Sequence, residues 1–178
     1  YYLNQQRVIH KDIKPANILI HPDSKQIRLI DFSISSLLPK EPQEIKNPNG
    51  LEGTLAYLAP EQTGRVNRGI DYRADFYSLG VTLFELLTGQ RPLQAEDAME
   101  LVHCHIAKQP PSVCDLADVP DSVSQIVHKL MAKNAEDRYQ SALGLKHDLE
   151  KCLYQLKEMG RVEPFDIGEK DRCDRFDI

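Results

Sequence analysis

The sequence shows no excess of positive charge and no long apolar stretch. It contains 22 Lys and Arg residues against 27 Asp and Glu residues, for a formal net charge of −5 at pH 7. This balance argues against a general nucleic-acid binder, which carries a basic patch. No apolar run approaches the length that a membrane span requires. Residues 1–5 also lack the charged start and the apolar stretch of a signal peptide.

Cysteine is scarce, and its spacing gives no sign of a disulfide framework. The chain has four cysteines, and none forms a Cys-x-x-Cys pair. We therefore expect reduced thiols and a cytoplasmic location. His103 and His105 flank Cys104 in a pattern that could indicate metal binding. Residues two apart on a helix do not share a face, however, so no metal site is expected there.

The length and composition are those of one domain, and we expect this domain to belong to a longer chain. The 178 residues are 41% hydrophobic and 28% charged, near the average for globular proteins. The chain starts without Met and within an expected helix, which indicates a fragment. After Gly160 the sequence is charged and weakly patterned. We therefore expect a domain over residues 1–157 and a linker to a following domain over residues 158–178.

A short β-hairpin and several helices are expected along the domain. Apolar runs at residues 17–20 and 27–30, separated by a cluster of turn-forming residues, predict the hairpin. Residues 74–88 are apolar on almost every side, which is typical of a buried helix. Apolar residues at helical spacing predict further helices, at 96–107, 122–132 and 141–156. The expected fold class is therefore mainly α with a small β element.

One segment concentrates residues that can carry chemistry. Residues 10–17, His-Lys-Asp-Ile-Lys-Pro-Ala-Asn, place an acid, a base and an amide at the entrance to the hairpin. Asn17 opens the first strand and Asp31 follows the second, so antiparallel pairing brings them together, facing Asp12 and Lys14. Their oxygens are ligands of the kind that Mg²⁺ takes. Taken singly, Asp12 or Asp31 would more readily be a turn or capping residue, as most Asp residues are.

Motifs in a fixed order resemble those of eukaryotic-type serine/threonine protein kinases. Residues 10–17 resemble the catalytic loop, His-Arg-Asp-x-Lys-Pro-x-x-Asn, and residues 31–33 resemble Asp-Phe-Gly. Residues 59–61 match Ala-Pro-Glu, and residues 75–80 resemble Asp-x-Trp-Ser-x-Gly. Arg138 stands where the family keeps an Arg that pairs with that Glu. The resemblance implies the C-terminal lobe of the kinase fold, a helical bundle with a hairpin at the catalytic cleft.

The resemblance assigns roles to the residues of the first two motifs. Asp12 would accept or orient the proton of the substrate hydroxyl, and Lys14 would neutralise the γ-phosphoryl group of ATP. Asn17 and Asp31 would hold Mg²⁺ against the ATP phosphates, and Leu19 would touch the underside of the adenine. Phosphoryl transfer depends mainly on such positioning and charge neutralisation. The implied activity is phosphorylation of protein Ser or Thr hydroxyls in signal transduction.

Two residues indicate a serine/threonine kinase rather than a tyrosine kinase. Lys14 stands two residues after the catalytic Asp, as it does in the Ser/Thr group, and Thr54 resembles the wall of that group's substrate pocket. The implied partner is therefore a protein substrate that offers Ser or Thr. Glu85 is equally well a contact for a basic substrate residue or an ordinary surface charge.

A second group of residues is expected to shape the site without reacting. It comprises two pairs and one further acid: His10 stacked on Phe32, Glu61 in a buried ion pair with Arg138, and Asp75. The ion pair would fix the substrate loop. The Asp75 carboxylate would cap its helix and hold the backbone of the catalytic loop. The side chains of Leu19, Thr82 and Leu86 are expected in the core.

Departures from the family motifs predict that the change between active and inactive states of the kinase is controlled differently. Lys11 replaces the Arg that grips a phosphate on the activation loop, and Lys lacks the bidentate geometry of Arg. Residues 37–53 contain no Ser, Thr or Tyr, so we expect no switching by phosphorylation there, with Lys11 pairing with a loop carboxylate instead. Ser33 replaces a Gly that permits a backbone flip, which should make the flip harder. An activating phosphate on Ser33, Ser35, Ser36 or Thr54 would contradict this hypothesis.

The sequence also lacks the motifs with which the N-terminal lobe of protein kinases binds ATP. It contains no Gly-x-Gly-x-x-Gly loop and no Val-Ala-Ile-Lys strand. By itself, the chain should bind ATP poorly and transfer nothing. Two alternatives to the kinase reading stay open: a pseudokinase that binds partners without catalysis, and a truncated gene product with an interaction role.

Two further segments narrow the resemblance. Residues 63–68 and 132–141 resemble the kinase domain that opens large bacterial, notably cyanobacterial, signalling proteins. In those proteins the kinase domain precedes an ATPase-like region and often a sensor histidine kinase. The resemblance therefore implies covalently linked signalling domains downstream of this chain.

Overall fold

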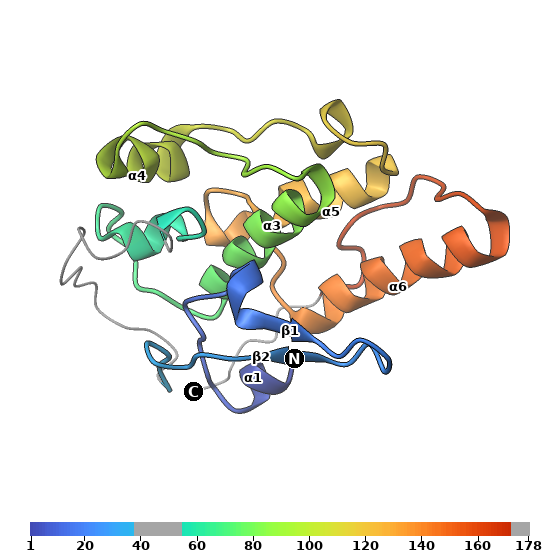
Figure 1. Cartoon of the computed structure of the whole chain (residues 1–178), viewed down its shortest axis with the longest axis horizontal. Coiled ribbons are helices and arrows are strands. Elements are labelled where there is room, and N and C mark those ends of the chain that lie inside the picture. Colours follow the sequence, from blue (N-terminus) through green and yellow to red (C-terminus); the bar gives the residue numbers. More distant parts are fainter. Residues whose placement is uncertain (38–54, 172–178) are drawn as a thin grey trace.

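The computed structural model describes residues 1–37 and 55–171, and this part of the chain is mainly helical with one small sheet (Figure 1). The predicted fold class is thereby confirmed. Among the described residues, no helix is both long and apolar enough to cross a membrane. The elements are the α-helices α1 (Tyr2–Gln5), α3 (Arg73–Thr88), α4 (Ala98–Ala107), α5 (Asp121–Leu130) and α6 (Ala142–Met159), the strands β1 (Ile18–Ile20) and β2 (Ile27–Leu29), and the short 3₁₀-helices η1 (Pro15–Asn17), η3 (Pro60–Thr63), η4 (Val113–Asp115) and η5 (Ala135–Asp137).

Strands β1 and β2 form the predicted antiparallel hairpin, at the lower edge of the molecule in Figure 1. Ile18 lies opposite Leu29, and the turn closes with a hydrogen bond from the Lys25 N–H to the His21 carbonyl at 3.0 Å. Leu19 was expected in the core, but its side chain is 52% exposed. The expectation is wrong because, within the described residues, the hairpin is a sheet of two strands only, and Leu19 lies on its exposed face.

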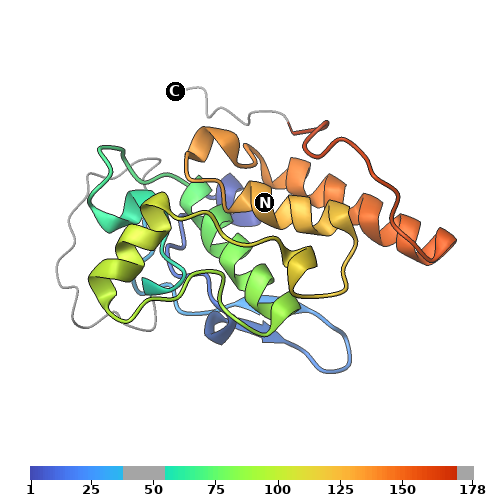
Figure 2. The same ribbon diagram turned by 90° about the horizontal axis from the view of Figure 1, so that it is seen from above.

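Helix α3 lies in the middle of the domain, between the hairpin and α5 (Figure 2). It ends at Gly89, which adopts the left-handed conformation with φ of 73° and donates its N–H to the carbonyl of Glu85 at 2.8 Å. Thr82 is fully buried, as predicted. Leu86 is 64% exposed instead of buried, because the buried residues of this helix run only from Ala74 to Phe84.

Two apolar clusters cover different faces of α3 and form the core. The first cluster is built around Tyr57, Tyr77, Val81, Phe84, Val127 and Met131. The second cluster joins α3 to α5 and α6 through Phe76, Ile126, Leu130, Tyr139, Leu145 and Cys152. The two central helices approach closely at Gly80, where a Cβ atom would lie 2.8 Å from the Leu130 Cβ and 2.8 Å from the Met131 Cγ. The site is therefore built on a tightly packed helical base.

The three later helices were predicted correctly except for a few residues at their ends. Helix α4 starts two residues later than the pattern suggests, because the Asp97 carboxylate caps it by accepting the Glu100 N–H at 2.8 Å. Helix α5 begins one residue earlier and ends two residues sooner than expected. Helix α6 begins after Ser141, whose hydroxyl accepts the Gly144 N–H at 2.9 Å, and it continues to Met159.

Residues 161–171 run back along the domain after α6 ends (Figures 1 and 2). Val162, Phe165 and Ile167 pack against the second cluster, beside α5 and α6. The predicted division into a domain over residues 1–157 and a linker from residue 158 stays a prediction. The described part of the later segment is nevertheless packed against the domain.

Candidate active site

The carboxylate of Asp12 stands at the centre of the candidate site. The side chain is 8% exposed, and its Oδ2 atom accepts hydrogen bonds from the Lys14 Nζ at 2.7 Å and from the Asn17 Nδ2 at 2.8 Å. Asn17 also donates to the Asp12 carbonyl at 2.9 Å. The other carboxylate oxygen, Oδ1, is buried and has no hydrogen-bond partner among the residues that the structure describes. Asp12 therefore presents one fixed oxygen and one oxygen left for an incoming donor.

The short turn η1 sets Asn17 against Asp12. Pro15 fixes the backbone at the first position of the turn, where a missing N–H costs nothing. The Asn17 N–H then bonds to the Lys14 carbonyl at 3.0 Å, and the Asn17 carbonyl accepts the Ile30 N–H at 3.0 Å. This last bond brings Asp31, the next residue along, beside Asn17. The structure thus joins Asp12, Lys14 and Asn17 by hydrogen bonds and places Asp31 directly after Ile30, whose N–H bonds to the Asn17 carbonyl.

Asp75 holds the backbone that precedes Asp12. It is 7% exposed, and its two carboxylate oxygens accept the N–H groups of His10 and Lys11, each at 2.8 Å. Burial raises the pKa of the Asp75 carboxyl above its ordinary value, while these two hydrogen bonds act in the opposite direction. Lys11 has a φ of 69°, a strained conformation for a residue with a side chain. Asp75 is the third residue of α3 rather than its cap, so its contacts are with the loop.

Asp31 also adopts a strained backbone conformation, with a φ of 62°. Its Oδ1 accepts the Ser33 hydroxyl at 2.6 Å and the Ser33 N–H at 3.3 Å. These hydrogen bonds hold the pKa of the Asp31 carboxyl below its ordinary value, so the group is ionised at neutral pH. Ser33, which replaces the family's Gly, therefore supplies a donor that Gly lacks. The His10 and Phe32 rings lie 4.6 Å apart, and the His10 Nε2 lies 3.1 Å from the Ile30 carbonyl.

The oxygens at the end of the hairpin suit Mg²⁺. Asp31 offers an ionised carboxylate, and the Asn17 side chain uses its nitrogen toward Asp12, which leaves its amide oxygen for another contact. Magnesium is commonly bound by one or two protein oxygens, with phosphates and water completing its shell. Among residues 1–37 and 55–171, no cluster of three or more His, Cys, Asp or Glu side chains forms a metal site of the all-protein kind. The donor set therefore fits a metal that is shared with a phosphate ligand.

A buried ion pair joins η3 to the turn before α6. The Arg138 guanidinium is fully buried and binds the Glu61 carboxylate through both of its oxygens, at 2.6 and 2.9 Å. Its remaining N–H groups donate to the carbonyls of Ala132 at 2.8 Å, Arg73 at 3.0 Å and Lys133 at 3.1 Å. All five guanidinium donors are thereby satisfied. This geometry rigidly connects residues 60–63 to the helical base.

Two polar contacts in this region were missed by the sequence analysis. Gln62 accepts the Ala59 N–H at 3.0 Å and donates to the Lys11 carbonyl at 3.1 Å, so it connects η3 to the loop that carries Asp12. The Tyr77 hydroxyl lies 2.9 Å from the Nδ1 of the fully buried His105 on α4. The available signal for the second contact was Tyr77 itself, because a hydroxyl at a position where the family has Trp requires a partner.

Burial changes the titration of two groups beside that tyrosine. It lowers the pKa of His105 from 6.5 to about 4, so this ring is neutral at physiological pH. It also lowers the pKa of Lys133 from 10.5 to about 8. Together with His105, Cys104 is buried, and neither forms part of a metal cluster in the described residues.

The remaining predicted residues lie at the border of the site or outside the described residues. Glu85 accepts the Tyr57 hydroxyl and lies 3.8 Å from the Arg91 Nε, so its carboxylate already has partners within the chain. Thr54 and the carboxylates proposed to pair with Lys11 lie outside the described residues. Leu19 stands on the exposed face of the hairpin.

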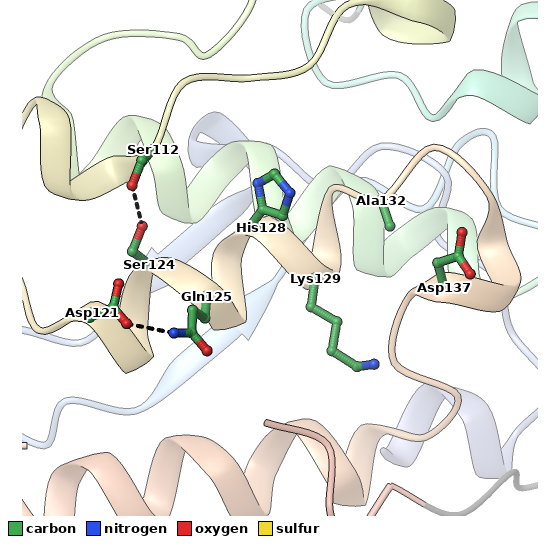
Figure 3. A pocket seen from close by; sticks show the side chains of 8 residues that line it. All are labelled: Ser112, Asp121, Ser124, Gln125, His128, Lys129, Ala132 and Asp137. Carbon is green, nitrogen blue, oxygen red and sulfur yellow. Dashed lines mark hydrogen bonds between the residues drawn. The ribbon is translucent and has the colours of Figure 1, made fainter. Parts of the chain in front are cut away.

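A hollow of about 520 Å³ opens beside α5. Figure 3 shows hydrogen bonds between Ser112 and Ser124, 3.0 Å apart, and between Gln125 and Asp121 on its wall. The lining carries charges of both signs and shares no residue with the Asp12 cluster.

Comparison with known proteins identifies the family. The profile of the protein kinase domain matches residues 1–149. Serine/threonine-protein kinase PknB of Mycolicibacterium smegmatis is 35% identical over 151 residues, which are 83% of this chain and 23% of that protein. Serine/threonine-protein kinase PknF of Mycobacterium tuberculosis is 37% identical over 142 residues, 78% of this chain and 29% of that protein. The chain therefore belongs to the protein kinase domain family.

A third relative is a multidomain signalling protein. Hybrid signal transduction histidine kinase G of Dictyostelium discoideum is 55% identical over 104 residues, which are 58% of this chain and 3% of that protein. In all three comparisons the chain spans less than a third of the relative's length. The similarity therefore concerns one part of each relative.

Proposed function

We propose that this chain is the larger lobe of a serine/threonine protein kinase, which transfers the γ-phosphoryl group of ATP to a protein hydroxyl. The observation that carries the proposal is the asymmetry of the Asp12 carboxylate. Its Oδ2 is fixed by Lys14 and Asn17, whereas its buried Oδ1 has no partner within the described residues. An unpaired buried acceptor costs free energy, and a substrate hydroxyl that donates to it would remove this cost.

Each residue of the cluster has a role in this reaction. The Asp12 Oδ1 accepts the hydrogen bond of the substrate hydroxyl and takes up its proton as the oxygen attacks phosphorus. Lys14, whose ammonium lies 2.7 Å from Asp12, neutralises charge on the transferred group. Asn17 and Asp31 would hold Mg²⁺, which supplies charge neutralisation on the ATP phosphates. Asp75 fixes the loop so that Asp12 needs no reorganisation at the moment of reaction.

The substrate class and the wider setting of the chain are parts of the same proposal. Lys14 and the two mycobacterial relatives support transfer to Ser or Thr rather than Tyr. The similarity to a hybrid histidine kinase supports a chain that is covalently joined to further signalling domains. A kinase that draws on cellular ATP and keeps reduced thiols would act in the cytoplasm.

The test is phosphate transfer from labelled ATP to a generic protein substrate, measured on the full-length protein. Asp12→Asn keeps the shape of the side chain but removes the base, so transfer should fall by about 10²- to 10⁴-fold. Asp23→Asn is the matched control, since Asp23 lies exposed in the hairpin turn and should leave the rate unchanged. Phosphoamino-acid analysis of the product should show phosphoserine or phosphothreonine.

Two results would contradict the proposal. If the Asp12→Asn protein transfers phosphate as fast as the wild type, Asp12 is not the base. If the wild-type protein neither transfers phosphate nor binds Mg²⁺–ATP, the chain belongs to a pseudokinase or to a protein with an interaction role.

A further inference from the structure

The carboxylate of Asp171, far along the chain from the catalytic loop, is fully engaged at the start of α6. Its Oδ2 accepts the Gln140 N–H at 2.8 Å, and its Oδ1 accepts both the N–H and the hydroxyl of Ser141 at 2.9 Å. Its own N–H bonds to the Gly168 carbonyl at 3.0 Å. Asp171 is thus built into the turn that leads from Arg138 into α6.

The rest of residues 161–171, which we call the strap, is also anchored. The Gly168 N–H donates to the Asp148 Oδ2 at 2.7 Å, and the same oxygen accepts the Tyr139 hydroxyl at 2.6 Å. The Phe165 ring lies under the Lys151 ammonium, 4.3 Å from its centre. Val162 and Ile167 pack on the second apolar cluster. The strap therefore has apolar, charged and hydrogen-bonded contacts with α6.

Gly144 shows how closely Asp171 is seated. A Cβ atom at position 144 would lie 2.7 Å from both the Cα and the Cβ of Asp171 and would also clash with its Oδ1. Real Cβ atoms do not approach other atoms so closely. Any side chain at this position would displace Asp171, so Gly144 provides a way to move the strap without removing a hydrogen-bonding group from it.

The turn that Asp171 holds is the one that carries Arg138. The Gln140 side chain donates to the Arg138 carbonyl at 2.7 Å and accepts from the Arg73 Nη1 at 2.8 Å, while the Gln140 carbonyl accepts the Tyr72 hydroxyl at 2.7 Å. The turn is thus held by α3 on one side and by Asp171 on the other. Arg138 in turn grips Glu61 of η3.

We propose that Asp171 is a positioning residue for residues 59–66, which contain Glu61 and follow Thr54 of the expected substrate pocket, and that it acts through the turn at residues 138–141. Without the Asp171 carboxylate, the N–H groups of Gln140 and Ser141 lose their acceptor, and the turn becomes more mobile. The positions of Arg138 and of its partner Glu61 then become less well defined. The inference rests on the proposed kinase function. It makes binding of the protein substrate depend on residues 161–171.

The ATP-facing residues are fixed by the Asp75 carboxylate of α3 rather than by this turn, and the link from η3, Gln62 to the Lys11 carbonyl, reaches the backbone before Asp12 and not Asp12 itself. Asp12, Lys14, Asn17 and Asp31 lie on the hairpin and its entrance, and Asp75 fixes that loop directly. Loss of the Asp171 contacts should therefore raise the KM for the protein substrate and leave the KM for ATP unchanged. A general loss of stability would change both.

The experiment compares variants of the full-length protein in two assays. Steady-state kinetics should show a rise of about tenfold in the protein-substrate KM for Asp171→Ala, because the N–H groups of Gln140 and Ser141 lose their acceptor. Gly144→Ala should act in the same direction, and Asp171→Asn should lie between Asp171→Ala and wild type, because the Asn carbonyl keeps one acceptor. Asp166→Ala, an exposed acid in the same strap, is the control and should match the wild type.

Peptide-resolved hydrogen exchange provides the second assay and does not require activity. Exchange in residues 59–66 should become faster in Asp171→Ala and Gly144→Ala but not in Asp166→Ala. The proposal is overturned if exchange rises only in the strap itself, or if the KM values for ATP and for protein substrate rise together. If the wild type transfers no phosphate but exchange at residues 59–66 still responds, the proposed function fails while the coupling stands.

Discussion

Replacement of Glu61 by Gln provides a quantitative test of the buried ion pair. The Glu61 and Arg138 side chains are 3% and 0% exposed, so neither charge can be compensated by water when its partner is removed. Glu61→Gln leaves the Arg138 charge unpaired and turns an amide NH₂ toward guanidinium donors. Breaking a buried pair by removing one partner costs about 3–5 kcal/mol. We expect destabilisation in that range.

Arg138→Met should destabilise the domain more than Glu61→Gln does, and the hydrogen bonds of Arg138 indicate the size of the difference. It leaves the Glu61 carboxylate unpaired and also removes the donors to the carbonyls of Ala132, Arg73 and Lys133. Because each unsatisfied buried group costs about 1–3 kcal/mol, and these carbonyls keep part of their hydrogen bonding, we expect Arg138→Met to exceed Glu61→Gln by about 1–3 kcal/mol. The double variant should be less destabilised than the sum of the single variants, by about 2 kcal/mol.

The assay is urea unfolding of the full-length protein, with hydrogen exchange in peptides of α3 and α5 reporting the domain itself. The shift in the urea concentration at which these peptides are half unfolded gives the change in unfolding free energy, provided that the slope of the free energy against urea concentration is the same in each variant. A loss of less than 1 kcal/mol in Glu61→Gln, as in an exposed pair, would refute the reasoning. Equal losses in the two single variants, or strict additivity in the double variant, would also refute it.

Two more predictions concern the helical base. Gly80→Ala should destabilise the domain by about 1–3 kcal/mol, since the new Cβ meets Leu130 and Met131 at 2.8 Å. The measurement is the urea midpoint of unfolding of this variant against that of the wild type. Burial lowers the pKa of His105 to about 4 in the folded protein, against 6.5 in the unfolded chain. The contribution of the neutral ring to the free energy of unfolding is therefore fully present above pH 6.5, and about 3 kcal/mol of it is lost as the pH falls toward 4. His105→Gln should flatten that slope in a pH series of unfolding midpoints.

The sequence was informative wherever chemistry and local geometry are set by neighbouring residues. The hairpin follows from alternating apolar residues around a turn cluster, and η1 follows from Pro15. The grouping of Asp12, Lys14 and Asn17 needs only the few residues between them. Helix ends were predicted less well, because a cap such as Asp97 competes with the apolar pattern.

Contacts between distant segments could be expected only where a family motif indicated them. The pairs of Asp75 with the His10 N–H and of Arg138 with Glu61 span 65 and 77 residues. The contact of Gln62 with Lys11 spans 51 residues and was missed, as was the hydrogen bond between Tyr77 and His105. No local pattern encodes such pairs, because they form only when η3 and α4 are placed against α3.

By itself, the sequence determined the reactive groups, their order and the helical character of the domain, since these depend on residue type and spacing. Only the tertiary structure decided which oxygen of Asp12 is left without a partner, that Leu19 and Leu86 face outward, and that the segment ending at Asp171 is seated against α6. These features depend on which surfaces meet when the helices pack, and burial and hydrogen-bond satisfaction are properties of the whole packed domain.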